Sequence, residues 1–104
     1  MNIAKMMKQA QQMQKRMGEM QSELAAQEIQ ASVAGGKVVV TANGAGEVLG
    51  IKIDPAVVDP EDVELLEDLV LSGVKQAIAQ GKEMSQQEMS KLTAGLGLPP
   101  GLGF

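Results

Sequence analysis

The ionisable side chains of this 104-residue chain are carboxylates, lysines and one arginine, because the sequence contains neither His nor Cys. This composition excludes Ser-His-Asp and Cys-His nucleophiles and most zinc sites. The acidic residues fall on predicted solvent faces, without the enclosed pocket that acid–base catalysis needs. The stretches AGGK and ANGAGE lack the glycine spacing of a phosphate-binding loop. The sequence therefore predicts no enzyme, no cofactor, no metal site and no small-molecule substrate.

Charges of opposite sign are separated along the chain, although the net charge is only −4. Residues 1–17 carry four cations and no acid: Lys5, Lys8, Lys15 and Arg16. Residues 54–70 carry no base and seven acids, namely Asp54, Asp59, Glu61, Asp62, Glu64, Glu67 and Asp68. A partner responds to the local field rather than to the total charge. The first run is therefore a candidate for binding a polyanion.

The cationic run lies in a segment with a helical repeat. Apolar residues recur at alternating steps of three and four, forming what we call the Met seam: Ile3, Met6, Ala10, Met13, Met17, Met20 and Leu24. This pattern predicts a helix over about residues 2–26, within a first arm of residues 1–26, that packs against another helix. At about 100° per residue, the four cations fall opposite the seam. On this segment alone, the simpler interpretation is a solvated face.

Residues 28–54 are predicted to form a three-stranded antiparallel sheet. The strands are expected at about 28–34, 37–43 and 46–54, separated by the turn signals Gly35-Gly36 and Asn43-Gly44. We expect Leu49, Ile51 and Ile53 to mark the buried face of the third strand. Such a small sheet needs cover from a helix or from another sheet.

A second helix is predicted over residues 59–80, with Asp59 as its N-cap and Pro60 at its first position. Its apolar stripe faces the sheet and consists of Val63, Leu66, Val70, Val74, Ala77 and Ile78. The acids at its start complement the positive helix end. That role explains them better than a metal site, because no His or loop geometry supports one.

Gly81 is expected to interrupt this helix. Residues 82–92 then resemble the first segment in composition, which predicts a short third helix or a bent continuation. Its expected partner is the Met seam, since both surfaces are lined by Met, a residue that packs adaptably. Residues 93–104 are rich in Gly and Pro. We expect this tail to be mobile, or anchored only by Leu96, Leu98 and Phe104.

Three binding functions remain open from the residues alone. The cationic end of the first helix suits nucleic acid, and the Met seam suits an adaptor for a protein partner. A membrane-surface helix is disfavoured, because the apolar side contains no Trp, Phe or Leu cluster before Leu24. No apolar run approaches bilayer length and no signal peptide is visible, so we expect a cytoplasmic protein. Small size and a single aromatic residue favour an oligomer.

Five short stretches occur in a characteristic order over nearly the whole chain: MKQAQQMQKRM at 7–17, VTANGAGEV at 40–48, IKIDP at 51–55, LLEDLV at 65–70 and LPPG at 98–101. No single stretch is decisive. The set, its order and the chain length closely resemble the YbaB/EbfC family of small bacterial nucleoid-associated DNA-binding proteins.

This resemblance implies an α+β fold of helix, three strands and helix. It also implies a homodimer in which the first helix and the last helical segment project as paired arms from a central body. Family members bind double-stranded DNA through these arms and are linked to nucleoid organisation and gene regulation. Carried over to this chain, the DNA-contacting positions are Lys5, Lys8, Lys15, Arg16, Lys82 and Lys91. The location implied is the cytoplasmic nucleoid.

Overall fold

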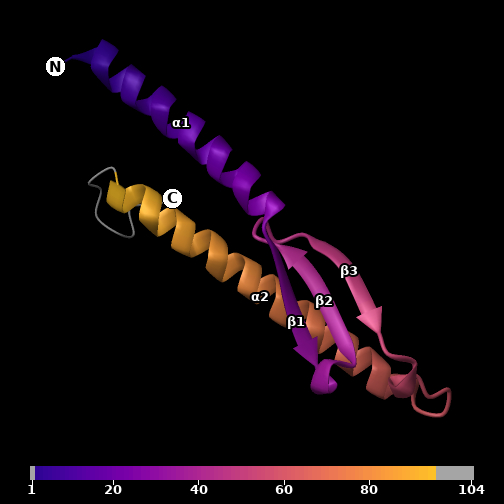
Figure 1. The fold of residues 1–104 in the computed structure, drawn as a ribbon. Coiled ribbons are helices and arrows are strands. Elements are labelled where there is room, and N and C mark those ends of the chain that lie inside the picture. Colours follow the sequence, from indigo (N-terminus) through magenta and orange to yellow (C-terminus); the bar gives the residue numbers. More distant parts are fainter. Residues whose placement is uncertain (1, 96–104) are drawn as a thin grey trace.

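The computed structural model describes residues 2–95, which form two long helices and one antiparallel sheet (Figure 1). The elements in chain order are α1 (Ile3–Ala26), β1 (Glu28–Val33), β2 (Val38–Asn43), β3 (Val48–Ile53) and α2 (Val63–Gly95). Two short 3-10 helices, η1 (Ala34–Gly36) and η2 (Pro55–Val57), lie in the connections. The molecule is elongated, measuring 70 × 21 × 17 Å. The predicted α+β fold is confirmed.

The sheet is built from two consecutive hairpins, in the strand order β1-β2-β3. Ala31 of β1 pairs with Val40 of β2, and Val40 pairs with Ile51 of β3. The first connection is not a two-residue glycine turn as predicted. Positive φ angles occur at three successive residues, including Ala34, so the chain reverses over the whole of η1.

The core lies between α2 and the first two strands. Its buried members are Ala31, Val38, Val40, Ala42 and Ala77. α2 approaches closely at Gly73, where a Cβ atom would lie 2.8 Å from Val40 Cγ2. A larger residue at this position would therefore separate the helix from β2.

The third strand is left largely uncovered by α2. All residues of Val48–Ile53 are exposed in the single chain, so the prediction that Leu49, Ile51 and Ile53 form a buried face is wrong for this chain by itself. The reason is geometric. A helix about 10 Å across covers about two strands spaced about 4.8 Å apart, and α2 lies over β1 and β2.

The second helix starts later than predicted and is not interrupted. α2 begins at Val63, and the carboxylate of Asp62 accepts a hydrogen bond from the Leu65 N–H at 3.2 Å, as an N-cap does. Asp59 instead accepts from the Glu61 N–H in a turn before the helix.

Gly81 lies inside α2, which runs without a break through the predicted segments 59–80 and 82–92 and on to Gly95. Glycine is needed there for close approach, because a Cβ atom at Gly81 would lie 2.5 Å from the Asn43 carbonyl oxygen. The predicted anchors Leu96, Leu98 and Phe104 lie outside the described residues.

Candidate nucleic-acid interface

Two helical arms extend from the same end of the sheet (Figure 1). One arm is α1, and the other is residues 82–95, the C-terminal part of α2. The Met seam is buried only near the sheet, at Met20 and Leu24, whereas Ile3 and Met6 at the far end are 68% and 55% exposed. Met13 and Met17, between these ends, are partly buried. The seam is therefore covered from Leu24 to about Met13, and its first turns are exposed.

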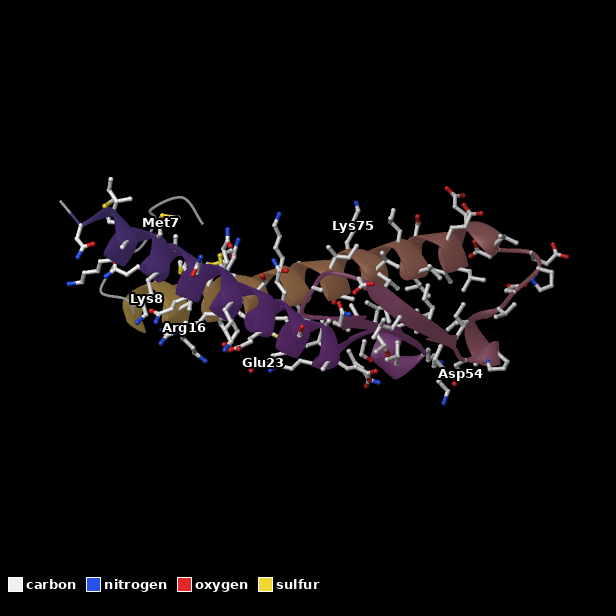
Figure 2. All side chains as sticks on the ribbon, turned by 90° about the horizontal axis from the view of Figure 1, so that it is seen from above. Met7, Lys8, Arg16, Glu23, Asp54 and Lys75 are labelled. Atoms are coloured by element: carbon white, nitrogen blue, oxygen red, sulfur yellow. The ribbon has the colours of Figure 1, made fainter. Side chains whose placement is uncertain are left out.

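The four cations of α1 are all exposed. In Figure 2, Lys8 and Arg16 point to the same side of the helix as Glu23, while Met7 points to the opposite side. None of the four forms an ion pair within residues 2–95. Lys8 and Lys15 are seven residues apart, which places them two turns or about 10 Å apart on nearly the same line. The structure thus provides one continuous cationic strip over the first half of α1.

An open cleft of about 300 Å³ lies between the two arms, beside the second half of α1 and the last turns of α2. It is lined by Arg16, Glu19, Met20, Glu23, Glu88, Lys91 and Leu92. Its three carboxylates outnumber its two cations, and Lys91 already pairs with Glu88 at 3.3 Å. A phosphate inside the cleft would meet more negative than positive charge. The three lysines of the cationic strip, Lys5, Lys8 and Lys15, do not line this cleft and are therefore the better phosphate sites, with Arg16 at its edge.

The two lysines predicted on the second arm are not brought together. Lys82 and Lys91 are nine residues apart, which places them on opposite sides of a helix. Lys82 lies at the base of the arm, in a depression with Ile78 and the turn residues Gly44, Ala45 and Gly46. Lys91 lies across the cleft from Arg16. Of the six predicted positions, four share a face and two stand apart from it.

The acidic run lies at the end of the molecule opposite the arm tips. Asp54 is far from Lys8 along the long axis in Figure 2. Between residues 2 and 95, no group of three or more acidic side chains is arranged to hold a metal ion. The separation of charge in the sequence therefore becomes a separation of charge along the molecule.

Sequence reasoning missed two features of the body. The first is a depression on the sheet, lined by Lys37 and Lys52 beside Asp54. Strand alternation could have indicated it, because it places Lys52 on the face opposite Ile51 and Ile53. Exposed apolar side chains also remain on β3 and on one flank of α2, where Leu71 and Ile78 lie. Val63 and Ile78 were predicted to face the sheet, and their exposure of 52% and 41% shows that this part of the predicted stripe is wrong for the single chain. A strand with apolar residues at four of six positions was the signal for this second surface.

An elongated α+β fold with an exposed cationic helical arm is typical of a protein that binds a polyanion. No helix in that range is both long and apolar enough to cross a bilayer.

Comparison with known proteins agrees with this class. The model of the YbaB/EbfC DNA-binding family matches residues 1–96. A nucleoid-associated protein of Akkermansia muciniphila is 51% identical over 104 residues, covering all of both chains. Another from Rhodospirillum rubrum is 50% identical over 103 residues, covering 99% of this chain and 96% of that protein. The chain belongs to the YbaB/EbfC family, which is a family of DNA-binding proteins and not of enzymes.

A solved structure supports the fold independently. An uncharacterized protein from Helicobacter pylori superposes with a TM-score of 0.66 at 21% identity. The alignment covers 77% of this chain and 93% of that protein. At this identity the likeness concerns the fold alone.

Proposed function

We propose that this protein binds double-stranded DNA as a homodimer through phosphate contacts from the α1 arms. The observation that carries the proposal is the exposed cationic strip of Lys5, Lys8, Lys15 and Arg16, which no carboxylate in residues 2–95 neutralises by an ion pair. Family membership and the nucleoid-associated relatives support DNA as the polyanion. The role we infer is nucleoid organisation or gene regulation in the cytoplasm.

Phosphates rather than base edges are the expected contacts. The strip offers lysines and one arginine on a helix, without a recognisable base-reading motif. Sequence preference would then arise from groove shape and deformability. Lys82 and Lys91 would contribute less than the strip, because one lies at the arm base and the other already pairs with Glu88.

A second copy of the chain is the proposed occupant of an exposed apolar surface, which we call the β3–α2 corner. It comprises four exposed side chains: Ile51 (45% exposed), Ile53 (37%), Leu71 (53%) and Ile78 (41%). Ile51 and Ile53 pair with the buried residues Val40 and Val38, so they share the sheet face that α2 covers only in part. β3 is also an edge strand, which proteins seldom leave both apolar and open.

Twofold symmetry suits this surface, because an isologous interface uses the same patch on both copies. It would add apolar burial to a core that is thin in the single chain. Pairing two copies also doubles the number of cations offered to one duplex, from four to about eight.

The first test is fluorescence anisotropy with a labelled duplex at about 50 and 200 mM salt, the interval over which phosphate-driven binding weakens strongly. If about eight phosphates are contacted, log K falls against log salt with an upper-limit slope of about −7. Binding at low salt that is lost at high salt is the expected result. No binding at low salt, from a folded dimer, would contradict the proposal.

A protein-interaction adaptor is the second candidate. The observation in its favour is the exposed apolar tip of α1, formed by Ile3, Met6 and Met7. Its signature would be partner binding that survives high salt and is lost on Met6→Asp.

A further inference from the structure

We propose that Asn43, Gly44 and Gly81 form a rigid joint that fixes the angle between the two arms and so positions the cationic strip for DNA. These three residues are positioning residues and do not themselves contact DNA. The effect of the joint on DNA binding rests on the proposed function, whereas the angle between the arms can be measured without DNA.

Three separate segments meet at this joint: the last turn of α1, the β2–β3 turn, and the point in α2 where the body ends and the arm begins. Asn43, Gly44 and Gly81 are all buried. Because both arms start here, the contacts of the β2–β3 turn determine the direction in which each arm leaves the sheet (Figure 1).

The first arm is attached to the turn by hydrogen bonds. The Gly44 N–H donates to the carbonyl oxygens of Leu24 at 2.9 Å and Gln27 at 3.1 Å. Asn43 Nδ2 donates to the Ala25 carbonyl oxygen at 3.2 Å. These bonds satisfy carbonyl groups that the end of a helix otherwise leaves without partners. The turn therefore acts as the C-terminal cap of α1 from a distant part of the sequence.

Both polar atoms of the Asn43 side chain form hydrogen bonds. Its Oδ1 accepts from the N–H groups of Ala45 at 3.1 Å and Glu47 at 3.0 Å. Its Nδ2 also donates to Glu47 Oε1 at 3.1 Å. With both donors and the acceptor engaged, a buried amide has little freedom to rotate. The joint thus transmits the orientation of the turn to α1.

The second arm is attached by close packing at glycine. A Cβ atom at Gly81 would lie 2.5 Å from the Asn43 carbonyl oxygen. The first arm is equally close to the turn, since a Cβ atom at Gly44 would lie 2.7 Å from Leu24 Cδ2 and 3.0 Å from the Leu24 carbonyl oxygen. Real Cβ atoms do not approach other atoms so closely, so an alanine at either position forces an arm away from the turn.

Contacts farther along the described arms are looser than those at the joint. Beyond Met20 the seam is covered only in part, at Met17 and Met13, and the residues before Met13 are exposed. The cleft between the arms is open. An error in angle at the joint therefore grows with distance, because α1 extends about 35 Å from its base at about 1.5 Å per residue. Small changes at the joint would move Lys8 and Lys5 by more than they move Arg16.

The test compares three glycine-to-alanine variants. Gly44→Ala and Gly81→Ala strain the joint, whereas Gly18→Ala adds the same methyl group to α1 where nothing lies within 4 Å. Since the chain has no Cys, spin labels at Gln11→Cys and Gln87→Cys report the distance between the arms, with excess unlabelled chain suppressing signals between subunits.

We expect Gly44→Ala and Gly81→Ala to shift the inter-arm distance distribution and to weaken DNA binding about tenfold at low salt. Gly18→Ala should leave both unchanged. An unchanged distance in the folded joint variants would overturn the joint, and a shifted distance with unchanged DNA affinity would overturn its positioning role. If the unmodified protein fails to bind DNA, the proposed function fails while the distance measurement still decides the joint.

If Gly44→Ala does not fold, Leu24→Val tests the same contact from the helix side. It removes the Cδ2 methyl group that lies against Gly44. The expected result is a broader inter-arm distance distribution than that of the unmodified protein. A distribution of unchanged width would count against the joint.

Discussion

At the scale of single residues, the charges of α1 determine what the arm can bind. Lys8 and Lys15 lie on one line of the helix, exposed and without an ion pair in residues 2–95. We expect Lys8→Glu combined with Lys15→Glu to abolish binding in the anisotropy assay at low salt, because two phosphate contacts per subunit become repulsive. Helicity and dimerisation should not change, since neither side chain packs against the body.

A matched control has the same change in net charge. Lys37→Glu combined with Lys52→Glu places both reversals on the sheet, away from the arms. This variant should retain most of the DNA affinity. Equal loss in both variants would show that total charge, and not the strip, governs binding, and retained binding in the folded α1 variant would contradict the site assignment.

Carboxylates beside Arg16 should weaken the contact that this residue makes. Glu19 and Glu23 line the same cleft as Arg16. We expect Glu19→Gln with Glu23→Gln to raise DNA affinity severalfold at low salt, with the gain shrinking as salt screens the charges. Glu61→Gln with Glu64→Gln, at the acidic end of the molecule, is the control and should have a smaller effect. A loss of affinity would mean that these acids orient Arg16 productively.

The four α1 cations were predictable as a group because helical periodicity depends only on local sequence. Lys82 and Lys91 were carried over from the family resemblance, and their separation on opposite sides of α2 follows from their spacing of nine residues. The close approach at Gly81 was not predictable, since it depends on a residue 38 positions away, Asn43. Glycine that permits contact and glycine that ends a helix look alike in a sequence.

At the scale of elements, the start of α2 illustrates how capping is decided. Both Asp59 and Asp62 are suitable N-cap residues, and Pro60 favoured the first of them. The chain instead uses Asp59 to close a turn, with the Asp62 N–H donating to its carbonyl oxygen at 2.9 Å. The boundary therefore moved by about one helical turn, because η2 and this turn connect β3 to the helix.

The cap predicts a measurable difference between the two aspartates. Asp62→Ala should lower the free energy of unfolding by about 1 kcal/mol, because it leaves the Leu65 N–H without its partner. Urea denaturation followed by circular dichroism measures this change. Asp59→Ala is the comparison and should have the smaller effect, since it affects only an exposed turn. The reverse order would place the functional cap at Asp59.

At the scale of the whole molecule, opposite charges occupy opposite ends of a molecule 70 Å long. The acidic end would repel DNA and the α1 tips would attract it, so the protein should engage a duplex with its arms leading. The negative net charge is therefore compatible with DNA binding. The exposed apolar side chains of the β3–α2 corner lie between these charged ends, and we propose that a second copy covers them.

Disrupting the β3–α2 corner tests dimerisation and DNA binding together. We expect Ile51→Asp to convert the dimer into a monomer in light scattering, because a charge would be buried without a partner in the interface. The salt slope should then fall to about half of the dimer value, as only one strip contacts the duplex. Gln30→Asp, on the exposed edge of β1, is the matched control and should remain dimeric. A folded Ile51→Asp dimer with an unchanged slope would place the interface elsewhere.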